Sequence, residues 1–286
     1  MTAVFSAEDL KRLLAPSEVL GTLANQCGLI STDTRSLEPG QWYLALKGET
    51  FDGHQFVDSA LKRGAAGCIV QTMPPSVVPP PDSALVKVDD TLLAYHKLAS
   101  AWRKKVNPFV IGVTGSSGKT TTKEMCAAVV SCLRSHKSSA NENNEFGVPK
   151  TILSMPADTK VLVVEMAMRG LGQIALLAET ASPDVGIITG VGTAHIELLG
   201  SVENIIKAKC EMFQHLNENA IAVIGNPVEA LVEYAKSAYG GQFALFPEED
   251  VQEAEVAFDQ TRFTVRGFTG EFTVNAHGIR HLQDAW

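Results

Sequence analysis

A strand, a glycine-containing turn and a helix follow one another without interruption near the middle of the chain. The apolar run PFVIGV at 108–113 leads into TGSSGKTTTKE at 114–124, which enters a helical pattern. Glycines let a backbone curl so that its N–H groups and the start of the helix face an anion. Lys119 can then reach terminal phosphates, and the Thr120 hydroxyl can bind a bridging magnesium ion. The segment predicts a buried strand that ends in a phosphate-binding loop.

The spacing of this loop is the short T-G-x-x-G-K-T form. Val113 stands where the longer G-x-x-x-x-G-K-[ST] form has its first glycine. A glycine-rich turn with a solvated lysine is the alternative, but strand, two glycines, Lys-Thr and helix in register favour phosphate binding. No guanine-reading N-K-x-D tetrad is evident, which favours ATP. The predicted nucleotide-binding residues are Thr114, Gly115, Ser116, Ser117, Gly118, Lys119, Thr120 and Thr121.

Strand and helix patterns alternate regularly from residue 108 onward. Strands are expected at 109–113, 161–165, 185–189 and 221–224. The helices between and after them are expected from about 119 and at 171–179, 201–216 and 227–237. Such alternation predicts a doubly wound, mostly parallel α/β sheet with helices on both faces. From about 254, Thr, Phe and Val enrichment around two glycines predicts an appended antiparallel hairpin.

The preceding part of the chain reads as a smaller α/β domain. Strands are expected at 42–48 and 66–72, with a helix at 54–65 between them. The proline-rich stretch 73–83 can be neither a helix nor a central strand. An amphipathic helix at 91–105 then ends before Asn107-Pro108. The sequence therefore predicts two domains, 1–106 and 107–286.

Charge, hydropathy and cysteine usage exclude several classes of protein. A net charge of −8, from 24 Lys+Arg against 32 Asp+Glu, disfavours a non-specific nucleic-acid binder. No apolar run reaches the roughly 18–20 residues of a membrane-spanning helix, and the first residues lack a signal-peptide pattern. The five scattered cysteines include no C-x-x-C pair, which favours reduced thiols over disulfides or zinc. A cytoplasmic protein without membrane insertion is expected.

Five segments carry a resemblance to a known family. They are STDTRSLEPGQWYLALKGETFDGHQF at 31–56, TGSSGKTTTKEM at 114–125, NENNEFGVPKTIL at 141–153, VVEMAMRGLGQI at 163–174 and TGVGTAHIELLGSVENIIKAKCEMF at 189–213. Together they resemble the Mur ligases, in the expected order over almost the whole chain. The N-x-N-N-x-x-G-x-P and E-M-A-M-R-G blocks favour members that add D-alanyl-D-alanine to UDP-N-acetylmuramoyl-tripeptide, a step of peptidoglycan precursor synthesis.

The resemblance implies an ATP-dependent amide ligase that passes through an acyl phosphate. The first domain would bind the UDP precursor and the second ATP. Magnesium ions, Lys119 and backbone donors would offset the repulsion between nucleotide and carboxylate. The resemblance assigns the metal site to Thr120, Glu165, His195 and Lys209, and catalytic roles to Lys119, Lys209 and His195. By itself, His195 would be a hydrogen-bonded core histidine and Glu165 a surface acid at a strand end.

Lys209 aligns with the lysine that is carbamylated in most Mur ligases. Carbamylation turns a cation into a carboxylate-like group suited to magnesium. Without the resemblance, Lys209 would be a solvated helix lysine near Glu211. Lys207 is the competing residue, and helix geometry separates the two by about 200°, so that only one can face the site. Lys209 is the expected one.

Substrate contacts are expected in both domains. The family places Asn143 and Asn144 near the metal and the substrate carboxylate, although Asn141, Asn143 and Asn144 also suit a simple polar turn. Asp33-Thr34-Arg35 would hold the UDP end of the precursor, with Arg35 on the diphosphate and Thr34 as a hydrogen-bond donor. The same residues could form only a turn with a surface salt bridge. Lys47 and the loop 51–54 would shape the same pocket.

Two alternatives remain open at this stage. One is another member of the superfamily, which adds a different amino acid or acts on folate-like or polymeric substrates. The other is a non-catalytic nucleotide- and precursor-binding module, because the chain stops at Trp286, near where the family has adenine contacts, here at 282–284. The family's third domain, which closes over the other two, would then be missing. The expectation is a truncated, monomeric chain that turns over poorly or not at all.

Overall fold

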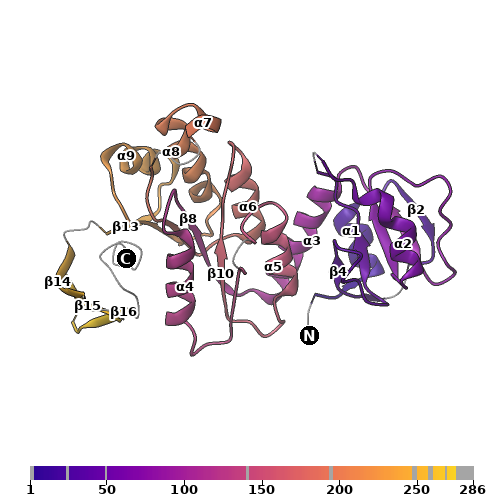
Figure 1. The fold of residues 1–286 in the computed structure, drawn as a ribbon, viewed down its shortest axis with the longest axis horizontal. Helices are drawn as coiled ribbons and strands as arrows, with labels where there is room; N and C mark the ends of the chain where they lie inside the picture. Colours follow the sequence, from indigo (N-terminus) through magenta and orange to yellow (C-terminus); the bar gives the residue numbers. More distant parts are fainter. Residues whose placement is uncertain are drawn as a thin grey trace. The chain divides into compact units, whose positions relative to one another are not determined.

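The computed structural model describes residues 3–23, 26–48, 50–139, 142–192, 196–246, 250–256, 260–267 and 269–274. The chain divides into two compact units (Figure 1). The first contains Met1–Asn107 together with Pro149–Thr159, and the second contains Pro108–Val148 together with Lys160–Trp286. Each unit is a layered α/β structure with a sheet of its own.

The first unit is built on a five-stranded sheet. Its strand order is β2 (Glu18–Gly21), β7 (Ala84–Lys87), β6 (Gly67–Val70), β5 (Trp42–Leu44) and β4 (Ile30–Ser31), with β2 antiparallel to β7 and the other pairs parallel. The remaining elements are β1 (Phe5–Ser6), β3 (Gln26–Cys27), α1 (Ala7–Leu14), η1 (Gly53–Phe56), α2 (Val57–Lys62) and α3 (Thr91–Val106). The central strands β5 and β6 are buried throughout, as expected for parallel strands covered on both faces.

Sequence patterns locate β5, β6, α2 and α3, whereas no element was expected before residue 42. The strand expected at 42–48 stops at Leu44, because the chain turns there and Lys47 pairs instead with Asp52 in an isolated antiparallel bridge. The proline-rich stretch forms neither helix nor strand, as expected. Helix α3 begins at the Asp90 cap, whose carboxylate accepts the Leu93 N–H, and ends where Asn107 is left-handed at φ 51°.

Residues 149–159 pack with the first unit although the neighbouring sequence belongs to the second. They include most of helix α5 (Gly147–Ser154). The indole N–H of Trp102 donates to the carbonyl of Met155 at 3.0 Å, and Ile152 and Met155 are fully buried. The periodicity of a short apolar helix does not tell which core receives it, so the packing of residues 149–159 with the first unit could not be predicted from the sequence.

The second unit contains a six-stranded sheet in which every pair is parallel. Its order is β13 (Gln242–Leu245), β12 (Ile221–Ile224), β11 (Val185–Ile188), β8 (Phe109–Thr114), β10 (Val161–Glu165) and β9 (Ser135–Lys137). The edge strands β9 and β13 were not expected. The helices are α4 (Lys119–Val129), α6 (Gln173–Ala181), α7 (Ile196–Leu199), α8 (Val202–Cys210), η2 (Glu211–His215) and α9 (Glu229–Ala238).

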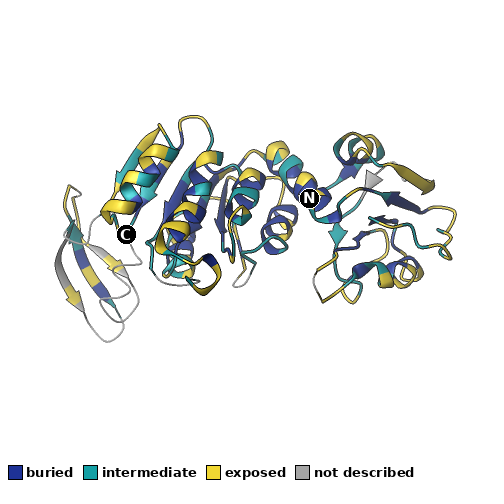
Figure 2. Ribbon diagram, turned by 90° about the horizontal axis from the view of Figure 1, so that it is seen from above, coloured by how far each residue is buried: buried dark blue, intermediate teal, exposed yellow. Residues whose placement is uncertain are grey.

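The order of strands in this sheet fixes where a ligand can bind. From β8 the chain first crosses to the edge strand β9, then returns through β10 to β11 on the other side of β8. Right-handed connections then place α4 on one face and α6, α8 and α9 on the other. Figure 2 shows the central parallel strands as mostly buried ribbons, flanked by helices with exposed outer sides. The crevice at the carboxyl ends of β8, β10 and β11 is the expected site for a ligand.

The C-terminal part of the second unit is antiparallel, as its composition predicts. Strands β14 (Val251–Val256), β15 (Thr261–Val265) and β16 (Phe272–Val274) pair in sequence order. They form a three-stranded sheet of their own, separate from the parallel sheet. Across the described ranges, no helix combines the length and apolar character needed to span a bilayer.

Candidate active site

The loop that joins β8 to α4 is held by the segment that follows β11. Gly115 leaves no room for a side chain, because an added Cβ would lie 1.8 Å from the Thr189 hydroxyl. That hydroxyl donates to the carbonyl of Ser117 at 2.5 Å. The Ser116 N–H donates to the carbonyl of Gly190 at 3.0 Å. These contacts fix the curl of the loop before any ligand is bound.

The end of the loop starts helix α4 without a side-chain cap. Gly118 takes the N-cap position at φ 77°, a left-handed conformation that suits glycine. With no capping side chain, the first N–H groups of the helix remain for a ligand, and the helix dipole favours an anion there. At the other end of the loop, the Thr114 hydroxyl is completely buried and has no hydrogen-bond partner among the described residues. Residues 114–121 thus form one continuous cradle of the kind that binds phosphate.

Lys119 occupies the first position of α4 and folds back over the loop. Its Nζ donates to the carbonyl of Gly115 at 2.9 Å. Burial lowers the pKa of the ammonium, and the nearby charge of Glu165 acts in the opposite direction. The ammonium needs only to leave the Gly115 carbonyl to meet a phosphate in the cradle.

Glu165 brings together three of the predicted site residues. It ends β10, opposite Val113 of β8, and is 2% exposed, so its interpretation as a surface acid is wrong. The Thr120 hydroxyl donates to Glu165 Oε2 at 2.9 Å, and the Asn143 amide donates to Glu165 Oε1 at 2.9 Å. Hydroxyl and carboxylate oxygens are the ligands that Mg²⁺ prefers, so the residues present fit this ion.

The Asn144 side chain caps the turn that leads into helix α5. Its side-chain oxygen accepts the N–H of Gly147 at 2.9 Å and that of Phe146 at 3.2 Å, at the start of α5. Its role toward a substrate stays a prediction. Asn141, His195 and residues 282–284 lie outside the described residues, so their expected roles also stay predictions.

Lys209 and Lys207 differ sharply in burial. Lys207 is exposed, whereas Lys209 is 2% exposed. Burial, and then the charge of Lys119, lower the pKa of Lys209 to about 7. Glu211 does not neutralise Lys209, because its carboxylate accepts the N–H groups of Gly172 and Ala175 at 2.7 and 3.1 Å. Lys209 is therefore a buried amine close to the phosphate cradle, and a solvated helix lysine is the wrong description.

The low pKa of Lys209 predicts a specific pH dependence of stability. The folded value of about 7 lies below the ordinary 10.5, so the unfolded chain binds more protons between these pH values. The contribution of this residue to the free energy of unfolding should rise with pH above 7, by up to about 1.4 kcal/mol per pH unit. We expect Lys209→Met to lack this rise. Urea unfolding at pH 7, 8 and 9 in CO₂-free buffer measures the difference.

Lys207→Met is the matched control for this measurement. It removes an exposed ammonium from the same helix, two residues away, and should keep the pH dependence of the wild type. Parallel stability curves for Lys209→Met and the wild type would contradict the low pKa of Lys209.

In the first unit, Asp33-Thr34-Arg35 forms a turn after β4. Asp33 accepts from Arg35 Nε at 3.0 Å and from an Arg35 terminal nitrogen at 2.7 Å. These bonds hold the pKa of Asp33 down at about 2. The Arg35 side chain is 88% exposed, so the predicted surface salt bridge is present. Its exposed guanidinium can still meet an anion from solvent.

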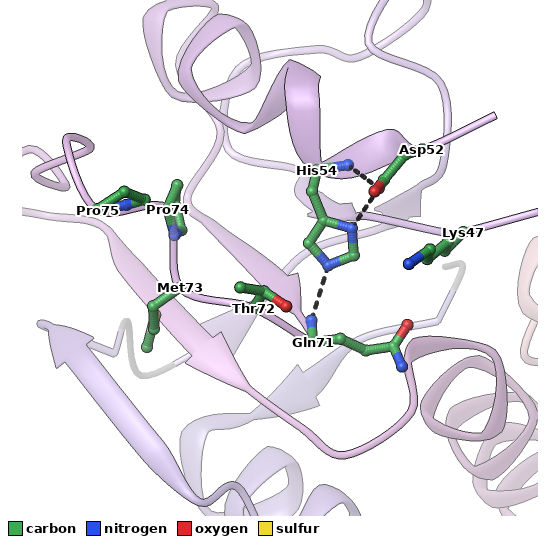
Figure 3. A pocket seen from close by; sticks show the side chains of 8 residues that line it. All are labelled: Lys47, Asp52, His54, Gln71, Thr72, Met73, Pro74 and Pro75. Carbon is green, nitrogen blue, oxygen red and sulfur yellow. Dashed lines mark hydrogen bonds and ion pairs between the residues drawn. The ribbon is translucent and has the colours of Figure 1, made fainter.

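The first unit also contains a cavity of about 290 Å³, whose walls come from residues after this turn in the sequence. Lys47, Asp52, His54, Gln71, Thr72, Met73, Pro74 and Pro75 line it (Figure 3). Lys47 and two residues of the loop 51–54, Asp52 and His54, are in this lining, as expected for residues that shape one pocket. Asp33, Thr34 and Arg35 are not in it. The sequence did not single out Gln71 and Thr72, although both stand directly after a buried strand and before the proline-rich stretch.

Hydrogen bonds fix the imidazole at one wall of this cavity. The Gln71 N–H donates to His54 Nε2 at 2.8 Å, so Nδ1 carries the proton and donates to Asp52 Oδ1 at 2.6 Å. The loop is tight at Gly53, where an added Cβ would meet the Leu46 carbonyl oxygen at 2.7 Å. Figure 3 shows His54 held between Asp52 and Gln71, with Lys47 beside them. The cavity thus presents an amine next to a rigid polar wall.

Comparison with known protein families matches both units. Residues 27–103 match the model described as "Mur ligase family, catalytic domain", and residues 113–280 match "Mur ligase middle domain". The second match alone spans more than half of the chain. It contains the phosphate cradle, Glu165 and Lys209.

Curated relatives and solved structures agree with these matches. The chain is 49% identical to a UDP-N-acetylmuramoyl-tripeptide–D-alanyl-D-alanine ligase of Synechocystis over 74% of this chain and 47% of that protein. It is 40% identical to the ligase of that name from Bacillus subtilis over 93% of this chain and 60% of the relative. The chain thus spans about half of the former and three fifths of the latter.

Two solved structures share the fold over most of the chain. MurF from Acinetobacter baumannii superposes with a TM-score of 0.88 at 28% identity, over 99% of this chain and 63% of that one. The MurF ligase of Thermotoga maritima in complex with ADP gives a TM-score of 0.79 at 31% identity, over 90% and 60%. With both units matched in sequence and fold, this chain belongs to the Mur ligase family.

Proposed function

We propose that this chain supplies the precursor-binding and ATP-binding parts of a ligase that joins D-alanyl-D-alanine to UDP-N-acetylmuramoyl-tripeptide. The observation that carries the proposal is the phosphate cradle with the Thr120–Glu165 pair at its edge. The names of the Synechocystis and Bacillus subtilis relatives support these substrates over those of other Mur ligases. The reaction would belong to cytoplasmic peptidoglycan precursor synthesis, in a monomer.

ATP is the nucleotide of this proposal. Residues 114–121 would hold its phosphates, and Lys119 would leave the Gly115 carbonyl for the terminal phosphates. The ADP in the Thermotoga maritima structure supports this choice. Thr120, Glu165, His195 and Lys209 would hold Mg²⁺, which offsets the negative charge of the phosphates when bound. Asn143 would orient the Glu165 carboxylate through its amide.

Carbamylation of Lys209 is part of the proposal. Only a neutral amine attacks CO₂, and an ordinary lysine with a pKa near 10.5 is almost entirely protonated at neutral pH. The pKa of Lys209, about 7, keeps a large fraction of its amine neutral there. The product would be an anionic carbamate close to Lys119, where it would replace repulsion between two cations by attraction.

The chemistry requires two successive substitutions. A carboxylate oxygen of the tripeptide attacks the γ-phosphorus of ATP and ADP leaves, which gives an acyl phosphate. The amine of D-alanyl-D-alanine then attacks the acyl carbon, inorganic phosphate leaves and the amine loses a proton. The preformed cradle favours the first step, because its donors are already oriented when the substrate arrives.

The first unit would bind the UDP end of the precursor. Arg35, exposed beside Asp33, has the forked guanidinium that suits a diphosphate, and Thr34 would add a hydrogen bond. Lys47 would act from the cavity that it shares with His54 and Gln71. Asp33 would orient Arg35 through the hydrogen bonds between their side chains.

Measurement of ATP turnover tests the proposal. We expect the 286-residue chain to bind MgATP and UDP-N-acetylmuramoyl-tripeptide but to release little phosphate when D-alanyl-D-alanine is added. A chain as long as the relatives should release phosphate in a dipeptide-dependent manner. Substantial dipeptide-dependent release by the 286 residues would contradict the first expectation. Turnover of the longer chain with a single amino acid would favour another Mur ligase activity. Size-exclusion chromatography with light scattering measures the oligomeric state.

A further inference from the structure

Lys123 is a completely buried lysine that the proposed chemistry does not use. It lies in α4, three residues after Thr120, and is 0% exposed. Residues three apart share one face of a helix, so Lys123 and Thr120 both face the sheet edge formed by β10 and β9. A buried ammonium is costly unless its hydrogen bonds are satisfied. An apolar residue would fill the same space at lower cost, so the contacts of Lys123 need an explanation.

Two contacts tie the Lys123 ammonium to the strand beside Glu165. Its Nζ donates to the carbonyl of Ser138 at 3.1 Å and lies 2.9 Å from Glu124 Oε1. Glu124 also pairs with Lys137, the last residue of β9. The hydrogen bonds of Lys137 and then of Lys123 lower the pKa of Glu124, so this carboxylate stays ionised. Helix α4 is thereby attached to the end of β9 by an ion pair and by a charged hydrogen bond.

Ser138 connects this attachment to the backbone of Glu165. Its N–H continues the parallel ladder by donating to the Val163 carbonyl at 3.0 Å. Because β9 ends at Lys137, the Glu165 N–H finds no strand carbonyl on that side and donates instead to the Ser138 hydroxyl at 3.2 Å. On the other side, the Met166 N–H donates to Val113 of β8. Ser138 therefore sets the position of the Glu165 backbone.

These contacts connect helix α4 to Glu165, at the edge of the cradle, in two separate ways. The Thr120 side chain reaches Glu165 directly, at 2.9 Å. Lys123, from the same helix, reaches Glu165 through Ser138. With both links in place, α4 can neither rotate nor slide along β10 without breaking a buried hydrogen bond. The separation between the Thr120 hydroxyl and the Glu165 carboxylate is thus fixed from two directions.

We propose that Lys123 is a positioning residue that holds Thr120 and Glu165 at the separation required for a divalent cation on bound nucleotide. The inference rests on the proposed function, because it assigns these two side chains to Mg²⁺. Lys123 does not touch the ligand and acts through Ser138. Groups that orient metal ligands from behind typically change metal affinity by about 10–100-fold when they are removed.

Calorimetric titration of the 286-residue chain with ATP tests this role. Each variant is titrated once with excess Mg²⁺ and once with EDTA. The Kd in EDTA divided by the Kd with Mg²⁺ is the ratio that gives the contribution of the metal. We expect Lys123→Met to reduce this ratio by about tenfold or more. The Kd in EDTA should stay within about twofold of the wild type, because the loop residues that face the phosphates are unchanged.

Lys137→Met is the matched control. It removes a cation from the same ion-pair group around Glu124 without touching the Ser138 carbonyl, and should keep the wild-type ratio. Ser138→Ala removes the link to the Glu165 N–H but keeps that carbonyl, and should also lower the ratio. In the double variant of Lys123→Met and Ser138→Ala, the two effects should not add, since both interrupt one path.

The outcomes separate this inference from the proposed function. If the wild type shows no Mg²⁺-dependent gain in ATP affinity, the proposed function fails and this inference with it. If the wild type shows the gain and folded Lys123→Met keeps it, Lys123 has only a structural role and the inference is wrong. Thermal unfolding establishes whether Lys123→Met folds. If Lys123→Met does not fold, Ser138→Ala becomes the test. A Mg²⁺ contribution to ATP affinity equal to that of the wild type in Ser138→Ala would then overturn the inference.

Discussion

Lys119→Ala should weaken ATP binding by about 10–100-fold, since a hydrogen bond to a charged group contributes about 1.5–3 kcal/mol. Lys119 starts α4, and its ammonium already lies over the loop, 2.9 Å from the Gly115 carbonyl. Burial has lowered its pKa, so part of the desolvation cost of meeting a phosphate is already present in the free protein. Calorimetric titration with ATP measures the loss, and a longer chain with ligase activity should lose turnover altogether.

Lys236→Ala is the control for this substitution. Lys236 is an exposed residue of α9 in the same unit, and its removal lowers the net charge equally. It should leave the Kd for ATP unchanged. A wild-type Kd for Lys119→Ala, or equal losses in both variants, would refute a direct role of Lys119 at the phosphates and leave only long-range attraction.

Glu165→Gln should remove most of the Mg²⁺-dependent part of ATP affinity. The substitution keeps the shape of the side chain but deletes the negative charge that would face the cation. One of the two carboxylate oxygens also becomes an amide nitrogen, which accepts no hydrogen bond, so the Thr120 hydroxyl and the Asn143 amide can no longer each donate to an oxygen of their own. Removal of a group that only orients a metal-binding side chain lowers metal affinity by about 10–100-fold. Loss of the metal-binding carboxylate itself should lower it at least as much. ATP titrations with Mg²⁺ and with EDTA measure the effect.

Glu179→Gln is the matched control for Glu165→Gln. Glu179 is an exposed acid of α6 in the same unit, so the two variants have the same net charge. Its Mg²⁺ dependence should equal that of the wild type. A Glu165→Gln protein that keeps the full metal contribution would show that this carboxylate only braces Thr120 and Asn143.

Much of the second unit was predictable because each of its signals is local. The apolar strand before residue 114, the two glycines and the Lys-Thr pair define the strand, loop and helix within a few residues. The strands expected at 161–165 and 221–224 were confirmed residue by residue. The edge strands β9 and β13 were missed, since short edge strands are partly exposed and carry weak periodicity.

The choice between the two lysines of α8 shows what sequence periodicity can decide. Side chains two residues apart on a helix point in different directions, so the sequence already required that only one of these lysines face the interior. The structure identifies Lys209 as that residue. Its pKa of about 7 could not be read from the sequence, because it depends on burial and on the charge of Lys119, 90 positions earlier in the chain.

Sequence alone determined that this chain contains a strand–loop–helix of the phosphate-binding kind and the motifs of a Mur ligase, because glycine spacing and short sequence motifs are defined within a few residues. Tertiary structure alone decided which side chains meet. Thr120, Asn143 and Glu165 come from three separate segments, and parallel pairing of β8 with β10 brings them to one edge. It also buried Lys123 behind that edge and joined residues 149–159 to the first unit. Such contacts depend on strand order and packing, which are properties of the whole fold.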